Sequence, residues 1–447
     1  MNPKQIAKEW LASHPGATSV QAGFFDLNGQ LRGKRMPVQN LTKVLDGGTR
    51  MPLSLTGVDI WGSDPDDSEL VFQSGDSDGI CQPTERGVVL NSIGQQPSAF
   101  VQLMLHNEDG TPFMGDPRQA LAQVVQQYKD RGLTVVVATE LEFYLSDPDD
   151  IYPTSQINAR VSDSHATVSL DELDHFEPFL NDVYKYCAEQ NVPADATISE
   201  NGSGQMEINL NHVPDPLKAA DDAMLFKRIV RAVARKHGRV ASFMAKPYGD
   251  RSGNGLHVHF SVLDRQGKNI FANGTSDGSE ELKFAVAGLL QAMPDCMAVF
   301  APHFNSYRRF APHSHAPGAV AWGYENRTTA IRIPGGPDVA RRIEHRVSGA
   351  DANPYLVLAC ILGAALLGLD AKVQPAAPTI GDAYSQDRPQ LPRMWDAAID
   401  AFEKSPVVAK IFAPILRNIF VTAKRQESAK FQQQVSAFEI KTYQDTA

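Results

Sequence analysis

Acidic side chains in an otherwise apolar stretch are the first indication of chemistry in this sequence. Glu140 and Glu142 lie two residues apart in TVVVATELEFYL, so on a strand both carboxylates would point to the same face, roughly 7 Å apart. Unpaired carboxylates among apolar residues are costly, and a divalent cation bound by oxygen ligands would neutralise them. Other residues that could join this cluster are Glu200 and Glu207 in SENGSGQMEIN, His257 in GLHVH and Glu344 in RRIEHR. Such a set indicates phosphate chemistry.

Arginines are concentrated between residues 308 and 346. A guanidinium group pairs bidentately with carboxylate or phosphate, so arginines beside a metal cluster suggest an acidic substrate next to a nucleotide, as in a kinase or a ligase. A solvated or salt-bridged surface is the alternative, above all for Arg308 and Arg341. The candidates are Arg308 and Arg309 in NSYRRF, Arg327 in YENRTTA, Arg332 in AIRIP, and Arg341, Arg342 and Arg346 in ARRIEHR.

Each of these residues also has a simpler explanation when taken alone. A Glu-x-Glu pair on a strand is usually a half-exposed face, and a lone His257 is more often a hydrogen-bonded core histidine. His259, which alternates with His257, and the glycines of RSGNGLHVH favour a ligand site, because glycine lets the backbone approach a ligand closely. The cluster is therefore a stronger signal than any of its members.

Composition and missing motifs disfavour several other classes of protein. The 42 Lys and Arg against 52 Asp and Glu give a net charge of -10 without a basic tract, so nucleic acid is not an expected partner. No GxxxxGK[ST], GxGxxG or GxSxG pattern occurs where a strand meets a helix, which disfavours P-loop, dinucleotide-binding and serine-hydrolase folds. The four cysteines are scattered, and the N-terminal residues lack the apolar core of a signal peptide. We expect a cytoplasmic protein with reduced thiols.

Local patterns predict the elements that would position the candidate residues. Asn28-Gly29 between alternating segments predicts a hairpin of residues 20–27 and 30–37. Two Asp-Pro starts and two glycine ends predict helices over residues 116–132 and 215–238. Buried strands are expected over residues 133–145, 240–246 and 256–263.

The strand at residues 256–263 would place His257, His259 and Ser261 on one face. The apolar run 355–369 is shorter than the roughly twenty residues that span a bilayer, so it predicts a buried helix and no membrane partner. The acidic residues 64–69 predict a solvated loop, and residues 374–392 predict a loop before the final helices.

Seven motifs occur in order along the chain: FFDLNGQLRGKRMP, TELEF, SENGSGQMEINL, KPYGDRSGNGLHVHFS, NSYRRFAP, ENRTTAIRIPGG and RRIEHRVSGADANPYL. With them the sequence resembles the glutamine synthetase superfamily almost end to end. The resemblance implies an α+β fold, with an N-terminal β-grasp domain in residues 1–108. A catalytic domain with a curved antiparallel sheet flanked by helices would occupy residues 109–447. It also implies a homo-oligomeric ring of six subunits, or a double ring of twelve, with active sites shared between neighbours.

The resemblance also implies roles for single residues. Glu142, Glu200 and Glu207 would hold one Mg²⁺ or Mn²⁺, and Glu140, His257 and Glu344 would hold the other. Arg309, Arg346 and the backbone near Gly253 would bind glutamate. Arg327 and Arg332 would stabilise the transferring phosphoryl group, while His259, Ser261 and Arg342 would lie near ATP.

Two departures from the family pattern concern the second substrate. Glutamine synthetases carry an Asp-Gly-Ser-Ser motif whose Asp binds ammonium, but this chain has LTGVDIWG with Thr56 at that position. The flap motif Gly-Tyr-Glu-Ala-Pro is replaced by His-Ser-His-Ala-Pro at residues 313–317. Because both ammonium-binding carboxylates are missing, the sequence resembles the γ-glutamylpolyamine and γ-glutamylamine synthetases. These join glutamate to an organic amine for catabolism; ammonia-dependent glutamine synthesis is the alternative.

The amine must lose a proton, since an alkylammonium has a pKa of about 10.4 in water. His315 on the flap is the predicted base, with Asp59 as another candidate and a pocket wall as the other role for His315. Which amine is used stays open. Asp59, Asp64 or Asp66 would suit a polyamine, whereas Trp61 or Phe310 would suit an apolar monoamine. The C-terminal residues 431–447 could reach across a ring interface.

Overall fold

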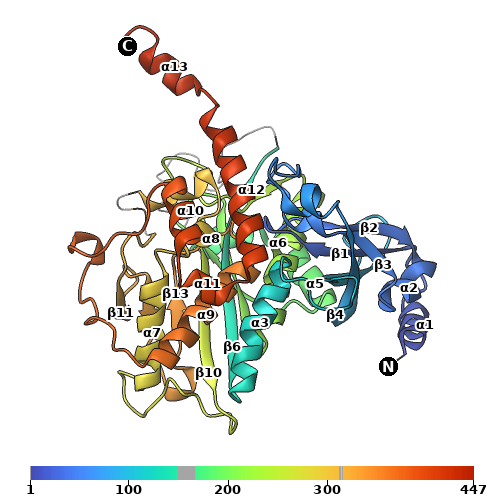
Figure 1. The fold of residues 1–447 in the computed structure, drawn as a ribbon, viewed down its shortest axis with the longest axis horizontal. Coiled ribbons are helices and arrows are strands. Elements are labelled where there is room, and N and C mark those ends of the chain that lie inside the picture. Colours follow the sequence, from blue (N-terminus) through green and yellow to red (C-terminus); the bar gives the residue numbers. More distant parts are fainter. Residues whose placement is uncertain (1, 149–166, 312–313, 315) are drawn as a thin grey trace.

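Two β-sheets and the helices around them form the protein (Figure 1). This computed structural model describes residues 2–148, 167–311, 314 and 316–447. Figure 1 shows the N-terminal sheet on one side of the molecule and the larger, helix-covered sheet on the other. The predicted α+β fold class is confirmed. The predicted boundary at residues 108 and 109 falls between the last strand of the first sheet and the next helix, and the division into two domains stays a proposal.

The first sheet has five strands in the order β2-β1-β5-β4-β3. Its strands are β1 (Ser19–Phe25), β2 (Leu31–Pro37), β3 (Thr49–Pro52), β4 (Asp78–Asn91) and β5 (Ser98–His106). The predicted hairpin is confirmed as the β1–β2 pair. Its turn is closed by the Asp26 carboxylate, which accepts from the backbone N–H groups of Asn28 and Gln30, and Gly29 supplies the positive φ of 70°.

The second sheet has eight strands in the order β11-β12-β13-β10-β6-β8-β7, with β9 also paired to β6. They are β6 (Thr134–Ser146), β7 (Ala194–Ser199), β8 (Gln205–Val213), β9 (Val240–Ser242), β10 (Leu256–Leu263), β11 (Trp322–Tyr324), β12 (Ile331–Ile333) and β13 (Ile343–His345). Neighbouring strands are antiparallel except the parallel β11 and β12. Strands β6 and β10 confirm the predictions for residues 133–145 and 256–263.

The strand predicted over residues 240–246 was wrong in its length, because β9 ends at Ser242. Beyond that point the chain leaves β6 and bonds to the glycine-rich loop instead. The backbone N–H of Asn254 donates to the carbonyl of Ala245 at 2.8 Å, and Asn254 Nδ2 donates to the carbonyl of Met244 at 2.9 Å. The local apolar pattern could not reveal this competing partner.

Helices cover the apolar face of the second sheet. The helices packed there are α3 (Pro117–Asp130), α4 (Leu170–His175), α5 (Glu177–Glu189), α6 (Pro216–Lys236), α7 (Glu280–Ala292), α8 (Met297–Phe300), α9 (Pro354–Ala371), α10 (Trp395–Lys404), α11 (Val408–Ile411) and α12 (Pro414–Gln432). Helices α1 (Pro3–Ser13) and α2 (Leu41–Leu45) lie beside the first sheet, and α13 (Ala437–Tyr443) extends away from the body of the chain. The predicted starts of α3 and α6 are confirmed, since Asp116 and Asp215 accept from backbone N–H groups of their first turns.

Helix α9 is the core helix predicted from the apolar run at residues 355–369. It is apolar and long enough to cross a membrane by composition alone, yet 78% of it is buried inside the protein. It crosses α7 so closely that a Cβ on Gly288 would lie 2.2 Å from the carbonyl oxygen of Ala364. This contact fixes the two helices against each other and leaves no room for a side chain at the crossing.

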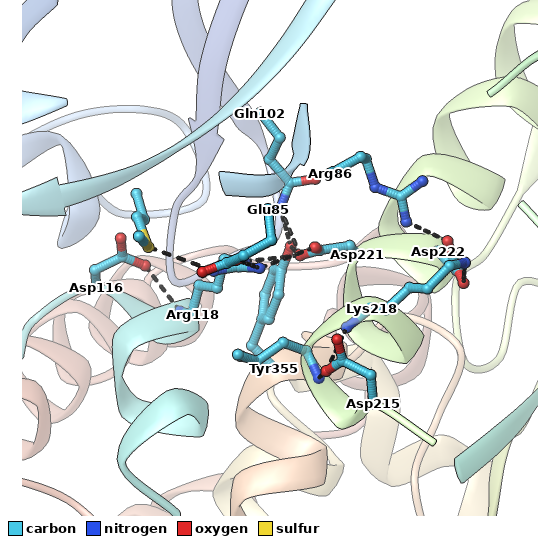
Figure 2. Close-up of polar contacts among 12 residues, drawn as sticks. Glu85, Arg86, Gln102, Asp116, Arg118, Asp215, Lys218, Asp221, Asp222 and Tyr355 are labelled. Carbon is cyan, nitrogen blue, oxygen red and sulfur yellow. Dashed lines mark hydrogen bonds and ion pairs between the residues drawn. The ribbon is translucent and has the colours of Figure 1, made fainter. Parts of the chain in front are cut away.

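A buried polar network joins the two sheets through α6 (Figure 2). Asp221 of α6 accepts from Arg118 Nε at 3.0 Å and Nη2 at 3.2 Å, and from the Tyr355 hydroxyl at 2.7 Å. Gln102 of β5 donates to the same carboxylate. Beside it, a bulge in β4 carries Arg86 to an ion pair with Asp222. The network therefore fixes β5, α3, α6 and α9 at one point.

Asp221→Asn should lower the free energy of unfolding by about 3–5 kcal/mol, because it leaves the buried Arg118 guanidinium with the largely exposed Glu85 as its remaining ion-pair partner among the described residues. Urea denaturation measures this change. The control is Asp370→Asn, which removes the half-exposed pair with Arg131 and should cost about 1 kcal/mol or less. Equal effects of the two substitutions would contradict a special role for the buried network.

Candidate active site

Strand pairing brings the candidate metal ligands to one face of the second sheet. Glu140 of β6 lies opposite His257 of β10, and Glu142 of β6 lies opposite Glu207 of β8. On the other side of β10, His259 lies opposite Glu344 of β13. Because side chains alternate along a strand, these registers place all of them on the same side. Segments separated by more than two hundred residues in the sequence thus supply one cluster.

The ligand atoms form three overlapping groups, within each of which the atoms lie within 4.8 Å of one another. The groups are Glu142 with Glu200 and Glu207, Glu140 with Glu207 and His257, and Glu140 with His259 and Glu344. All six predicted metal ligands are therefore brought together, and His259 joins them. Carboxylate oxygens with one or two imidazoles fit Mg²⁺ or Mn²⁺. The predicted division of ligands between two ions stays a prediction.

Burial and mutual repulsion strongly perturb these carboxyl groups. Burial and the nearby charges of Glu140, Glu142 and Glu200 raise the pKa of Glu207 to about 9. Burial and the charge of Glu142 likewise raise the pKa of Glu200 to about 7. The metal-free cluster therefore retains protons at neutral pH.

The pKa values of Glu140 and Glu344 are instead lowered. Burial alone would raise the pKa of Glu140, but hydrogen bonds and charge from His257 and His259 outweigh it and hold the pKa far below its ordinary value. Burial also opposes ionisation of Glu344, yet the charge of Arg346 contributes most to lowering its pKa to about 2. These two carboxylates are ionised at neutral pH.

The arginines differ in whether a carboxylate among the described residues pairs with them. Arg309 is buried and donates from Nη1 to the carbonyl of Val347 at 2.7 Å, but it pairs with no carboxylate in the described part of the chain. Arg346 and Arg332 both pair with Glu344, the latter at 2.8 Å. Arg327 is exposed at the cavity wall and has no carboxylate partner among the described residues. Arg309 and Arg327 are thus available to an anionic ligand.

Two neighbouring cavities contain the predicted site residues. The first, of about 650 Å³, is lined by all six predicted metal ligands together with Gly253, His259, Arg309, Arg327, Arg332, Arg342 and Arg346. The second, of about 800 Å³, is lined by Ser261 and again by Arg342, with His212 and Lys268 beside them. Arg342 borders both cavities and donates from Nε to Nδ1 of His259 at 3.1 Å. Of the residues predicted near ATP, His259 therefore lines the first cavity, Ser261 the second and Arg342 both.

Several residues named from the sequence lie elsewhere. His315 falls outside the described residues. Asp59, Asp64, Asp66, Trp61 and Phe310 do not line either cavity of this chain. Asp59 is instead buried against α12, where Lys430 pairs with it at 2.7 Å. Thr56 is fully buried and donates its hydroxyl to the carbonyl of Leu53 at 2.8 Å, so it leaves no carboxylate at that position.

The sequence patterns did not single out Gln205, Asn209 or His212, which also line the cavities. Gln205 and Asn209 flank Glu207 at spacings of two on β8, so their side chains share its face. The same alternation that selected Glu140 and Glu142 could have found them. His212 carried no comparable signal, because its contact with the second cavity depends on the position of distant loops.

The fold and the ligand cluster define a glutamine synthetase-type enzyme, and comparison with known proteins agrees. Residues 114–443 match the family model described as the glutamine synthetase catalytic domain, and the chain belongs to this family. It is 36% identical to gamma-glutamylputrescine synthetase PuuA of Escherichia coli, over 98% of this chain and 93% of that protein. It is 32% identical to glutamate–isopropylamine ligase of a Pseudomonas species, over 99% of both chains.

Ammonia-using relatives and solved structures also match. A glutamine synthetase of Pyrococcus horikoshii is 30% identical over 91% of this chain and 88% of its own length. A structure described as a GmaS–ADP complex superimposes with a TM-score of 0.86 at 28% identity, covering 98% of this chain and 99% of that one. The predicted family and fold are thereby confirmed.

The affinity for Mn²⁺ should rise as the pH increases from 7 to 9, because a cation must displace the proton held by Glu207. The expected slope approaches about tenfold per pH unit for each proton released. Titration calorimetry in buffers of different ionisation enthalpy counts these protons. Glu207→Gln should weaken binding and flatten the slope, whereas a pH-independent wild-type affinity would contradict the prediction.

The raised pKa of Glu207 also affects the stability of the protein when no cation is bound. Between the ordinary glutamate pKa and about 9, the folded protein holds a proton on Glu207 that the unfolded chain has lost. The free energy of unfolding should therefore fall as the pH rises through this interval. Saturating Mn²⁺ should remove this dependence, and thermal unfolding with and without the ion provides the comparison.

Proposed function

We propose that this protein joins the γ-carboxylate of glutamate to an organic amine, with hydrolysis of ATP to ADP and phosphate. One observation carries the proposal: a single cavity combines a cluster of acids that could hold metal ions with the buried guanidinium of Arg309, which has no carboxylate ion-pair partner among the described residues. A metal cluster alone would suit many phosphate enzymes. The added guanidinium selects a substrate with a carboxylate that must lie beside the transferred phosphate.

Glutamate would bind between Arg309, Arg346 and the loop at Gly253. Arg309 contacts this loop so closely that a Cβ on Gly253 would lie 2.9 Å from its Cγ. A carboxylate of the substrate would pair with the buried guanidinium of Arg309, for which the described residues supply no ion-pair partner. The other end of the substrate would then extend toward the acidic cluster.

Metal ions are part of the proposal because five glutamates converge there. Two Mg²⁺ or Mn²⁺ ions, held by Glu142, Glu200 and Glu207 and by Glu140, His257 and Glu344, would neutralise phosphate charge during transfer. ATP would lie along the second cavity, with His259, Ser261 and Arg342 beside it. Arg327 and Arg332 would then face the transferring phosphoryl group.

The reaction has two steps. An oxygen of the γ-carboxylate forms a bond to the γ-phosphorus of ATP, the bond to the bridging oxygen breaks, and ADP leaves. The amine nitrogen then forms a bond to the acyl carbon, phosphate leaves, and one proton passes from the nitrogen to a base. His315 remains the predicted base. The arginines serve the first step by stabilising charge on the transferred group.

An organic amine is favoured over ammonia because the chain lacks both ammonium-binding carboxylates. The buried Thr56 cannot attract a cation, and the flap carries histidines where the family has a glutamate. Several relatives are named for amine ligation, including gamma-glutamylputrescine synthetase and glutamate–isopropylamine ligase. Ammonia-dependent synthesis stays the alternative, since other relatives are named glutamine synthetase. The proposal of amine ligation includes a role in amine catabolism in the cytoplasm.

A ring-shaped homo-oligomer of six or twelve subunits is part of the proposal. Helix α13 extends away from the body of the chain (Figure 1). It exposes Phe438, Ile440 and Tyr443 to solvent, and large apolar side chains exposed together often mark a contact surface. A contact between subunits would cover these side chains.

Coupled measurement of ADP release with glutamate and a panel of amines tests the function. We expect turnover with at least one organic amine, such as putrescine, ethanolamine or isopropylamine, to exceed turnover with ammonium by more than about tenfold in kcat/KM, or about 1.4 kcal/mol. Mass spectrometry of the γ-glutamyl product identifies the bond formed. A preference for ammonium would support glutamine synthesis instead.

Arg309→Leu should raise the KM for glutamate by roughly 30-fold or more, because a buried charge pair with the substrate carboxylate is worth about 2 kcal/mol or more. The matched control is Arg308→Leu, since Arg308 is exposed and lies over the ring of Phe304. The control should change the KM for glutamate less than about twofold. Equal effects would remove Arg309 from the glutamate site.

A further inference from the structure

Gln205, the first residue of β8, has no role in the function proposed above, yet both the nitrogen and the oxygen of its side-chain amide form hydrogen bonds. It is 1% exposed. Its Nε2 donates to the Asn254 Oδ1 at 2.9 Å and to the carbonyl of Gly253 at 3.0 Å. Its Oε1 accepts from the backbone N–H of Gly202 at 3.1 Å. One side chain therefore connects the loop that follows Glu200 with the glycine-rich loop that precedes β10.

The glycine-rich loop is in turn fixed to the acidic cluster. The backbone N–H of Gly255 donates to Glu142 Oε2 at 2.8 Å, and Gln205 Nε2 lies 3.5 Å from the same oxygen. A Cβ on Gly255 would lie 2.8 Å from Arg309 Nη2 and 3.0 Å from His257 Nε2. The loop thus passes through a space just wide enough for bare backbone, and a small displacement would disturb its neighbours.

Other contacts also hold this loop, on both sides of Gly253. The Tyr144 hydroxyl donates to the carbonyl of Ser252 at 2.8 Å. Asn254 Nδ2 donates to the carbonyl of Met244 at 2.9 Å. Gln205 contributes the donor that faces the Gly253 carbonyl and the Asn254 side chain together. An amide suits this place, because a carboxylate would face two acceptors and add a charge beside Glu142.

We propose that Gln205 is a positioning residue for glutamate, which sets the place of the Gly253 loop relative to Arg309 and Glu142. The inference rests on the proposed function, since it takes this loop and Arg309 as the glutamate site. Gln205 acts through the loop. Binding of ATP, which the proposed function places beside Ser261 on β10 and Arg342 just before β13, would be little affected.

The test is Gln205→Met, which keeps the length of the side chain and removes its amide. Loss of a buried donor should raise the KM for glutamate by roughly 5- to 100-fold, with the KM for ATP changed less than about twofold. Gln205→Glu should have at least as large an effect on glutamate. The matched control is Gln119→Leu, since Gln119 is a buried glutamine on α3 that donates to the carbonyl of Leu105 at 3.1 Å.

A double variant separates positioning from general damage to the fold. If Gln205 acts through Asn254, the effects of Gln205→Met and Asn254→Ala on the KM for glutamate should be clearly less than additive. Additive effects would overturn the proposal, as would an unchanged KM for glutamate or equal increases for glutamate and ATP. If Gln205→Met is unstable, Gln205→Glu retains the side-chain shape and gives the same comparison.

The outcome for Gln205 can be distinguished from the outcome for the proposed function. An active wild type with an unchanged variant refutes the positioning role alone. A wild type that shows no ADP release dependent on both glutamate and an amine refutes the proposed function, and the positioning role with it.

Discussion

Repulsion among carboxylates is the constraint on which the site depends. The antiparallel registers of β6, β8, β10 and β13 force Glu140, Glu142, Glu207 and Glu344 onto one face, where they cannot move apart without breaking the sheet. Two histidines and two arginines compensate some of this charge, and protons compensate the rest in the absence of metal. The sheet therefore holds several carboxylates close together, in an arrangement that would bind cations.

The other face of the sheet supplies the stability that this arrangement requires. Apolar side chains of β6 and β10, such as Leu141 and Val258, are fully buried beneath helices. Helix α9 follows directly from the segment that carries Glu344 and Arg346, and its first turn contributes Tyr355 to the buried network around Asp221. The functional face and the interface between the sheets are therefore anchored to the same helix.

Much of this could be predicted from sequence, because alternation on a strand is a local property. It placed Glu140 with Glu142 and His257 with His259, and Asp-Pro pairs located the starts of α3 and α6. Which residues pair across strands is not local. The sequence therefore did not show that His259 adjoins the metal ligands or that Glu344 pairs with Arg332 and Arg346. Asp59 likewise was a candidate base, although α12 buries it from far along the chain.

The double pairing of Glu344 has a consequence for the order of events at the site. This carboxylate pairs with Arg332 and Arg346, two cations that an anionic substrate would also attract. A divalent ion bound by Glu344 would compete with both guanidinium groups for this carboxylate and leave them to an anionic ligand. The protein would then load its ions before its acidic substrates, and an empty site would discriminate against free ATP or glutamate arriving alone.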